Sequence, residues 1–309
     1  MYLLPHLGPD DVAAVPWPVV VEAIARAAVT DRAGGPARSA VPLARGEFLL
    51  MPAESPDAVG IKVLTIAPDN PALGAPRIQG VYLVFDQHTL TPRALIDGPA
   101  LTELRTAAVS THGILQLAPP DRTPGALVVF GSGPQAIAHA RALDAVRPPT
   151  GTTLIARDAT GLARAAAQLV DLQGPVLGIV ADRSAAVAEA VHGAEVVVCA
   201  TTARTPLFDG SWLADDALVV AVGSHEPVSR ELDAAVFARA AVVLVEDVPT
   251  ALREAGDVIL AVQEGVLDPG SLLPLGARIP AGIAGPRVFK SVGMAWEDLA
   301  IAGAVLARR

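Results

Sequence analysis

Gly131, Gly133 and Ala136 follow the pattern G-x-G-x-x-A within the segment ALVVFGSGPQAIAHARAL. Such a turn lets a pyrophosphate approach the backbone closely, and the helix that follows offers unpaired N–H groups to the phosphates. An apolar run precedes the turn and apolar residues at helical spacing follow it, as expected of a strand and a helix. The pattern predicts a dinucleotide site in which Gly131, Gly133, Pro134 and Gln135 contact the cofactor. The alternative is an ordinary strand-to-helix turn.

The residues after the next predicted strand bear on which dinucleotide fits. That strand, TTLIA, is followed by Arg157 and Asp158. An acidic residue in this place binds the ribose hydroxyls of NAD, whereas an arginine accommodates the 2′-phosphate of NADP. Because Arg157 comes first, the sequence favours NADP(H) slightly. Thr201, Gly223 and Ser224, which follow later predicted strands, are the other residues expected at the cofactor.

Strand and helix patterns alternate after the glycine turn. They run TTLIA, GLARAAAQLV, PVLGIV, SAAVAEAVHG and EVVVCAT, and two further strand candidates, ALVVAVG and AVVLVED, follow. Short buried strands that alternate with helices predict a doubly wound parallel sheet. Residues 118–287 are therefore expected to form a Rossmann-like dinucleotide-binding domain.

The chain before residue 118 has a different pattern. Short apolar runs such as GEFLLMPA, VGIKVLTI and GVYLVFD alternate with Pro, Asn and Gly, which predicts a mixed or mostly antiparallel sheet. VPWPVVVEAIARAAVTDRA predicts a helix that packs on this sheet, and the prolines of LAPPDRT favour a domain crossing there. SVGMAWEDLAIAGAVLA predicts a C-terminal helix that returns to the first domain. We therefore expect an α/β protein with a second, smaller α+β domain formed by residues 1–117 and 288–309.

Composition limits the classes of partner. The formal net charge of −9 over 309 residues argues against a general nucleic-acid or anionic-membrane surface, so a small molecule is the expected partner. Cys199, the single cysteine, lies in the apolar run EVVVCA and is expected to be a buried strand residue. No eighteen apolar residues run together and no basic leader is evident, which favours a cytoplasmic protein. The six histidines show no metal-ligand spacing, so no metal site is expected.

The segment LTELRTAAVS, upstream of the glycine turn, completes a set of motifs. It reads L-T-x-x-R-T-A-A, and G-x-G-x-Q-A follows at 131–136. Further matches are Pro36, Arg38, Gly60, Lys62, Asn70, Asp97, Gly98, RELD at 230–233 and the closing FKSVGMAWEDLA. In this combination the chain resembles the ornithine cyclodeaminase and mu-crystallin family over almost its whole length.

The resemblance implies a small amino- or imino-acid substrate whose carboxylate is held by Arg38, Lys62 and Arg105, with the nicotinamide lying opposite. An arginine fork can bind a carboxylate through two hydrogen bonds and a lysine adds a compact charge, although surface ion pairs are the alternative for these residues. Thr106 is expected either to contact the cofactor phosphate or to bond back to its own helix. The resemblance also implies a homodimer built by the smaller domain, which would bind the substrate.

The segment GSHEPVSRELD departs from the family pattern. Members that cyclise ornithine typically read G-x-D-x-P-G-K-x-E here, whereas this chain has His225 at the aspartate position and Val228 and Ser229 at the Gly-Lys pair. An imidazole titrates near pH ~6.5 and can exchange a proton with an imine or amine nitrogen. Lys62 and His225 are therefore the expected catalytic residues, and a loop histidine that only forms hydrogen bonds is the alternative. Leu90, where the family usually has glycine, predicts a different turn.

The intact glycine turn and the missing aspartate together favour an NAD(P)H-dependent reductase of small imino acids, or in reverse an amino-acid dehydrogenase. One alternative is ornithine cyclodeaminase, which forms proline and ammonia while NAD is recycled. Another is an NADP(H)-dependent small-molecule binding protein like mu-crystallin. The residues that would recognise the distal end of an amino acid follow no motif, so the substrate itself is not predicted.

Overall fold

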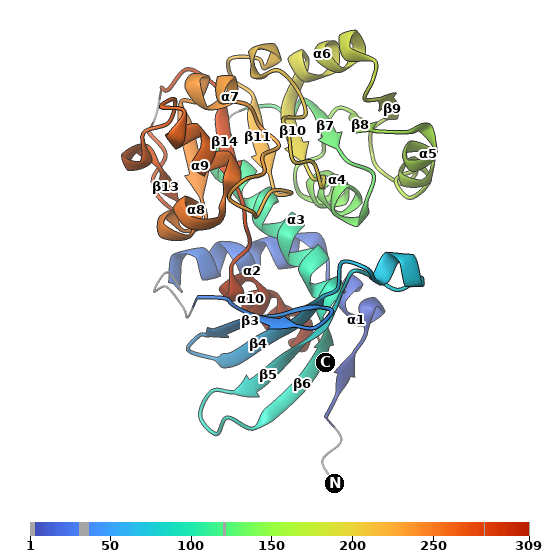
Figure 1. The fold of residues 1–309 in the computed structure, drawn as a ribbon, viewed down its shortest axis with the longest axis vertical. Coiled ribbons are helices and arrows are strands. Elements are labelled where there is room, and N and C mark those ends of the chain that lie inside the picture. Colours follow the sequence, from blue (N-terminus) through green and yellow to red (C-terminus); the bar gives the residue numbers. More distant parts are fainter. Residues whose placement is uncertain (1–3, 31–36, 120–121, 281, 309) are drawn as a thin grey trace. The chain divides into compact units, whose positions relative to one another are not determined.

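The structure is a computed structural model that describes residues 4–30, 37–119, 122–280 and 282–308. The chain divides into two compact units (Figure 1). Unit 1 is Met1–Val109 with Gly293–Arg309, and unit 2 is Ser110–Val292. Pro36, one of the family matches, lies outside the described residues.

The divisions between the units differ from the expected boundaries, and each difference has a local reason. Helix α3 (Gly98–Leu117) runs without a break past the first division, so the prolines that follow it end the helix but do not mark the change of unit. The expected second boundary, at 287/288, falls inside strand β14 (Arg287–Lys290), which pairs with two strands of unit 2. Val288, Phe289 and Lys290 therefore belong to the parallel sheet.

Unit 1 is built on a six-stranded sheet in the order β1-β6-β5-β4-β3-β2. Its strands are β1 (His6–Leu7), β2 (Ser39–Leu43), β3 (Gly46–Glu54), β4 (Ala58–Ile66), β5 (Ile78–Asp86) and β6 (Pro92–Asp97). Neighbouring strands are antiparallel except for β1 and β6, which are parallel. The predicted mixed sheet is thus confirmed.

One face of this sheet is buried. Helix α10 (Ala295–Leu306) packs on β3, β4 and β5 and on helix α2 (Trp17–Thr30), so the C-terminal helix does return to unit 1. Met51, Lys62 and Tyr82, which neighbour one another in register, lie on the buried face. The other elements of unit 1 are α1 (Pro9–Ala13), the 3-10 turn η1 (Asn70–Leu73) and the first part of α3.

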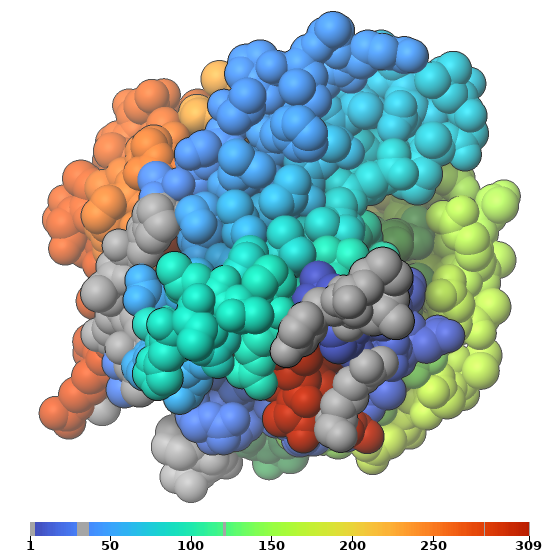
Figure 2. Space-filling view, turned by 90° about the horizontal axis from the view of Figure 1, so that it is seen from below, coloured from blue at the N-terminus to red at the C-terminus, as the bar shows by residue number. Residues whose placement is uncertain are grey.

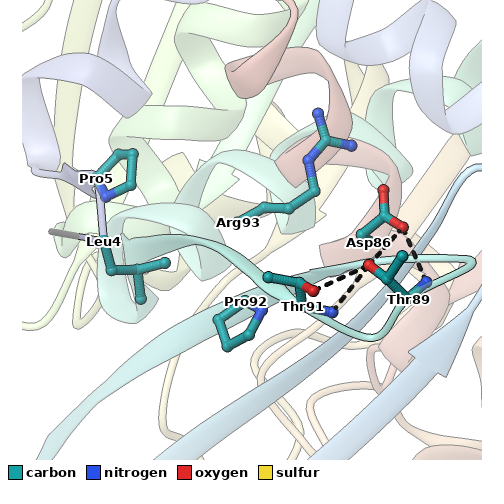
Figure 3. Close-up of a pocket in the computed structure, with 7 residues that line it drawn as sticks. All are labelled: Leu4, Pro5, Asp86, Thr89, Thr91, Pro92 and Arg93. Atoms are coloured by element: carbon teal, nitrogen blue, oxygen red, sulfur yellow. Dashed lines mark hydrogen bonds between the residues drawn. The ribbon is translucent and has the colours of Figure 1, made fainter. Parts of the chain in front are cut away.

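The hairpin between β5 and β6 contains an uncommon backbone conformation. Leu90 has φ +53°, in the left-handed region that glycine adopts without a steric penalty. The Asp86 carboxylate accepts a hydrogen bond from the N–H group of Thr89 at 3.0 Å (Figure 3) and another from that of His88 at 3.1 Å. Leu90 thus takes a conformation that glycine would adopt without strain, and the expectation of a turn different from that of the family stays a prediction.

Unit 2 contains an eight-stranded sheet in the order β13-β12-β14-β11-β10-β7-β8-β9, and every pair of neighbours in it is parallel. Its strands are β7 (Ala126–Phe130), β8 (Thr152–Ala156), β9 (Val176–Val180), β10 (Ala194–Cys199), β11 (Leu218–Ala221), β12 (Val242–Val245), β13 (Leu273–Pro274) and β14. The predicted doubly wound parallel sheet is confirmed.

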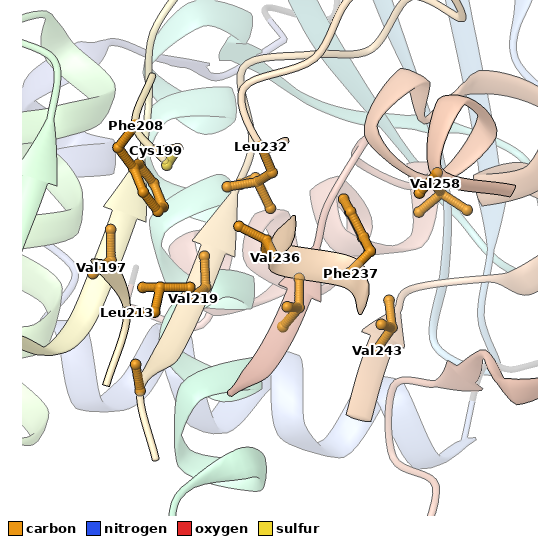
Figure 4. Close-up of a cluster of buried hydrophobic side chains, with 14 of the residues drawn as sticks. Val197, Cys199, Phe208, Leu213, Val219, Leu232, Val236, Phe237, Val243 and Val258 are labelled. Atoms are coloured by element: carbon orange, nitrogen blue, oxygen red, sulfur yellow. The ribbon is translucent and has the colours of Figure 1, made fainter. Parts of the chain in front are cut away.

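Helices follow most of these strands, as the alternating pattern predicts. They are α4 (Pro134–Val146), α5 (Ala159–Ala167), α6 (Ser184–His192), α7 (Ala234–Arg239), α8 (Val248–Glu254) and α9 (Gly256–Gln263), with 3-10 turns η2 (Gly210–Trp212) and η3 (Pro269–Ser271). Valines of β10, β11 and β12 pack with Phe208, Phe237 and Val258 in the core of this unit (Figure 4). Cys199 is fully buried in that core, as expected. No helix among the described residues is both long and apolar enough to cross a membrane.

Candidate active site

Lys62 lies on the buried face of the unit 1 sheet with 1% of its surface exposed. Its Nζ donates hydrogen bonds to Asp298 Oδ1 at 2.9 Å and to Thr102 Oγ1 at 3.3 Å. Burial disfavours the ammonium form and lowers the pKa of Lys62 to about 8, an effect that Asp298 opposes and Arg105 reinforces. Lys62 can therefore exchange a proton close to neutral pH.

Arg105, on α3, lies beside this pair. Its Nη1 donates to Glu297 Oε2 at 2.7 Å, and its Nε lies 3.5 Å from Asp298 Oδ1. The guanidinium also lies against Gly293, where an added Cβ would come within 2.3 Å of Nη1. Arg38 Nη2 donates to the carbonyl oxygen of the same glycine at 2.7 Å. Gly293, with φ +80°, is therefore the point at which the two arginines meet.

The structure thus brings together the three basic residues predicted for the substrate carboxylate, and Lys62 and Arg105 are buried, so for these two the surface ion pair is wrong. Glu297 and Asp298 pair with Arg105 and Lys62, and Arg38 lies beside Arg105 at Gly293. Cationic side chains gathered in this way can bind a carboxylate.

Tyr82 and the two α10 carboxylates are functional candidates that the sequence analysis missed. The Tyr82 hydroxyl is buried and has no hydrogen-bond partner among the described residues, and burial together with Asp298 raises the pKa of Tyr82 well above its usual value. The signal for Glu297 and Asp298 was present in AWEDLA, where two adjacent acids interrupt an apolar helix. Fully buried acids of this kind are rare unless they are paired.

The glycine turn of unit 2 has the shape that a pyrophosphate requires. Gly131 has φ +127°, and a Cβ there would lie 2.5 Å from the Ala200 carbonyl oxygen. Gly133 precedes α4 as its N-cap residue, and no atom lies within 4 Å of where its Cβ would be. Because a phosphate can approach this open backbone at a helix N-terminus, Gly131, Gly133, Pro134 and Gln135 fit a dinucleotide.

A buried histidine supports the same turn. His139 Nδ1 lies 2.7 Å from the Gln135 carbonyl oxygen, and its Nε2 lies 2.8 Å from Ser110 Oγ. Because a carbonyl only accepts, Nδ1 carries the proton and Nε2 accepts from the serine. Burial lowers the pKa of His139 to about 4, so the ring is neutral at physiological pH.

Glu231 joins the loops that follow β10 and β11. Its Oε1 accepts hydrogen bonds from the Thr201 N–H and hydroxyl at 2.9 and 2.7 Å, and its Oε2 accepts from the Gly223 N–H at 2.7 Å. The Ser224 hydroxyl donates to the Ser229 carbonyl. Thr201, Gly223 and Ser224 are therefore brought together at the carboxyl ends of neighbouring strands, and the hydrogen bonds described above join them to the protein itself.

For Thr106 and His225 the sequence left two roles open, and the structure shows the surroundings of each residue. The Thr106 hydroxyl donates to the Thr102 carbonyl oxygen at 2.7 Å, which is the bond back to its own helix. His225 is exposed in the loop after β11, where the adjacent Glu226 pairs with Arg204 at 3.0 Å. Arg157 and Asp158 are exposed at the end of β8, as expected for a ribose-binding position.

The surface pocket of unit 1 contains none of the predicted site residues. A surface pocket at the β5–β6 hairpin is lined by Leu4, Pro5, Asp86, Thr89, Thr91, Pro92 and Arg93 (Figure 3). Within the described ranges, no group of three His, Cys, Asp or Glu side chains is placed to hold a metal ion.

Comparisons with known proteins agree with this arrangement. The chain matches the ornithine cyclodeaminase/mu-crystallin family over residues 17–308. It is 33% identical over 283 residues to Delta(1)-pyrroline-2-carboxylate reductase of Bacillus cereus, with 88% of this chain and 85% of the relative covered. It is 34% identical over 271 residues to ketimine reductase mu-crystallin of Mus musculus, with 86% and 82% covered.

A solved structure is similar over nearly the whole chain. Delta(1)-pyrroline-2-carboxylate reductase of Thermococcus litoralis, in complex with NADH and L-proline, has a TM-score of 0.88 at 26% identity, with 99% of this chain and 97% of that chain covered. The chain is a member of the ornithine cyclodeaminase/mu-crystallin family.

Proposed function

We propose that the protein is an NAD(P)H-dependent reductase of small imino acids, with unit 1 binding the substrate and unit 2 the dinucleotide. The observation that carries the proposal is the cluster of three cations, in which Lys62 and Arg105 are buried and Arg38 and Arg105 meet at Gly293. Relatives named for pyrroline-2-carboxylate reduction and a ketimine reductase support the same class of substrate.

In this proposal the two arginines hold the substrate carboxylate. A guanidinium offers donors in a planar fork, and Arg105 is oriented by its bond to Glu297 and by the backbone of Gly293. Arg38 is oriented by the Gly293 carbonyl. Because both are already positioned, little side-chain freedom is lost when the substrate binds.

Reduction of a C=N bond needs a hydride at carbon and a proton at nitrogen. Bound NAD(P)H supplies the hydride. Lys62 is suited to give the proton, because with a pKa of about 8 its Nζ is protonated at neutral pH and yet readily releases a proton. His225 is the second candidate for this role, and Asp298 keeps the Lys62 ammonium in position.

The test is a panel of cyclic imines, including Delta(1)-pyrroline-2-carboxylate and Delta(1)-piperideine-2-carboxylate, with nicotinamide absorbance as the readout. We expect stoichiometric oxidation of NADPH or NADH. Ornithine with catalytic NAD⁺ should release no ammonia, since His225 stands where cyclodeaminases have an aspartate. Ammonia release without net cofactor reduction would favour the lyase, and cofactor and substrate binding without turnover would favour a binding protein.

Variants separate the proposed roles. Arg105→Leu should weaken substrate binding by about 2 to 5 kcal/mol while leaving dinucleotide binding nearly constant, and Arg105→Lys should also be impaired because the fork is lost. His225→Asn should lower kcat by about 10²- to 10⁴-fold if the imidazole exchanges the proton, and only modestly if it holds the loop. An unchanged KM in both Arg105 variants would remove Arg105 from the site.

The open face of the unit 1 sheet supports a homodimer as part of the proposal. Phe48, Val63, Leu83 and Leu95 lie on the face opposite Lys62 and are all partly exposed, and the segments of β3 to β6 spread across one face in Figure 2. Apolar sheet faces of this extent need a cover. Light scattering should give twice 31.5 kDa, and Val63→Lys should give the monomer, whereas Leu177→Lys in β9 should not. A 31.5 kDa species for the unmodified chain would reject the dimer.

A further inference from the structure

Glu246, which directly follows strand β12, holds a segment that is far from it in the sequence. Its Oε1 accepts a hydrogen bond from the Ser291 hydroxyl at 2.5 Å, and its Oε2 accepts one from the Val292 N–H at 2.9 Å. We call these two bonds the Glu246 anchor. Glu246 and Ser291 are both buried, and the Ser291 N–H donates to the Ala221 carbonyl oxygen at 3.1 Å. The anchored residues are therefore held by backbone and side chain together.

The chain passes from unit 2 to unit 1 immediately after this anchor. Val292 is the last residue of unit 2, and Gly293 begins the closing segment of unit 1. Gly293 has φ +80°, and its carbonyl oxygen accepts from Arg38 Nη2 at 2.7 Å. Its Cα lies so close to Arg105 that an added Cβ would be 2.3 Å from Nη1. Because glycine has no side chain to limit its own torsions, the residues before it must hold it in this conformation.

We propose that Glu246 is a positioning residue for substrate binding. By holding the two residues before Gly293, it fixes the direction from which the chain enters this glycine and so the carbonyl oxygen that orients Arg38. The inference rests on the proposed function, since it needs Arg38 and Arg105 to bind a carboxylate. Without the anchor the glycine could turn, and the arginines would have to be ordered each time a substrate binds, which weakens binding.

Steady-state kinetics with a cyclic imine of the panel tests the inference. Glu246→Gln leaves one oxygen to accept from two donors, and Ser291→Ala removes one of those donors. Each variant should raise the KM for the imine by about 5- to 50-fold and leave kcat within about 3-fold, because the arginines hold a carboxylate that does not change in the reaction. Binding of NADP⁺ or NAD⁺, measured by calorimetry, should persist and shows that unit 2 is folded.

A double variant and a matched control make the test specific. Glu246→Gln/Ser291→Ala should raise KM no more than Glu246→Gln alone, since both changes break the same bond. Glu195→Gln is the control, because Glu195 is also a buried carboxylate of unit 2 and accepts from the Gly125 N–H at 2.5 Å and from Arg147 at 2.7 Å. It lies near the start of β10, away from the anchored segment in the chain, and its loss should leave KM unchanged.

Hydrogen exchange separates a positioning role from a merely structural one. The Val292 amide should exchange faster in Glu246→Gln than in the unmodified protein, because its acceptor is shared with the Ser291 hydroxyl. An unchanged KM in Glu246→Gln and Ser291→Ala, with or without faster exchange, would overturn the inference while the reductase proposal stands. An equal rise of KM in Glu195→Gln would also overturn it. Failure of the unmodified protein to reduce any imine of the panel would overturn both proposals.

Discussion

Each unit contains a buried lysine among carboxylates, and the two clusters use their acids differently. In unit 1, Lys62 and Arg105 pair with Asp298 and Glu297, side chain to side chain. In unit 2, Lys290 lies 3.1 Å from Asp257 Oδ2 and is equally buried. Burial and charge alone therefore do not distinguish the cluster that we assign to chemistry.

The two clusters differ in the groups that donate hydrogen bonds to their carboxylates. Asp257 Oδ1 accepts the backbone N–H groups of Glu231 and Leu232 at 2.8 and 2.9 Å, and Glu231 in turn accepts those of Thr201 and Gly223. Burial raises the pKa of Glu231, although Lys290 and these hydrogen bonds oppose the shift. The acids of unit 2 thus hold loops in place, whereas those of unit 1 orient two cationic side chains that a substrate can use.

The comparison predicts its largest effect at Lys62. Lys62→Met should lower kcat by about 10²- to 10⁴-fold, since the proposed proton donor is lost. In the unmodified enzyme, activity should fall as pH rises through about 8, where Lys62 loses its proton, and Lys62→Met should lack this limb. NADP⁺ binding by calorimetry is the control for folding. A pH profile of the unmodified enzyme that is flat between pH ~7 and ~9 would contradict this role, whatever the variant does.

In unit 2 the same kind of change should reduce stability instead. Asp257→Ala should lower the free energy of unfolding by about 3 to 5 kcal/mol, because the buried Lys290 loses the carboxylate with which it pairs and two N–H groups lose their acceptor. Asp257→Asn keeps a hydrogen-bond acceptor and should lose less stability. Urea unfolding measures the free energy of unfolding of both variants. If either variant kept its stability and lost substrate affinity, the distinction between the clusters would fail.

Local pattern predicted the fold well where neighbours in sequence are neighbours in space. The run of Leu127 to Phe130, the glycine turn and the apolar spacing of α4 are contiguous, so periodicity and turn chemistry were sufficient. Strand β14 was not predicted, because two of its four residues, Phe289 and Lys290, were taken as the start of the closing family motif and the expected boundary at 287/288 divides the strand.

The site was predicted only in part, for a physical reason. Arg105 and Glu297 are 192 residues apart in the chain, and Lys62 and Asp298 are 236 apart. No period or spacing links such residues, since their proximity arises only when α10 packs on the sheet. The resemblance therefore supplied the three cations but not the acids that pair with them.

His139 provides a third prediction, on acid stability near the glycine turn. Its pKa of about 4 lies below the usual value near 6.5, so between these values the unfolded chain binds a proton that the folded chain does not. The free energy of unfolding should therefore fall as pH drops from about 6.5 to 4, by about 3 kcal/mol from this residue. His139→Gln should flatten that slope in urea unfolding at several pH values. An identical slope in the variant would show that His139 is not its source.

The smallest effect concerns one hydroxyl in each cluster. Thr201→Val removes a hydroxyl that donates to Glu231 at 2.7 Å, and it should lower the free energy of unfolding by about 1 to 3 kcal/mol, because the buried carboxylate loses a donor. Tyr82→Phe removes a buried hydroxyl with no hydrogen-bond partner among the described residues, so stability should be unchanged or slightly higher. Urea unfolding of the two variants gives the comparison directly. If Tyr82→Phe lost as much free energy of unfolding as Thr201→Val, the unit 1 cluster would also depend on its polar groups for folding. The contrast between acids that orient cations in unit 1 and acids that hold loops in unit 2 would then no longer stand.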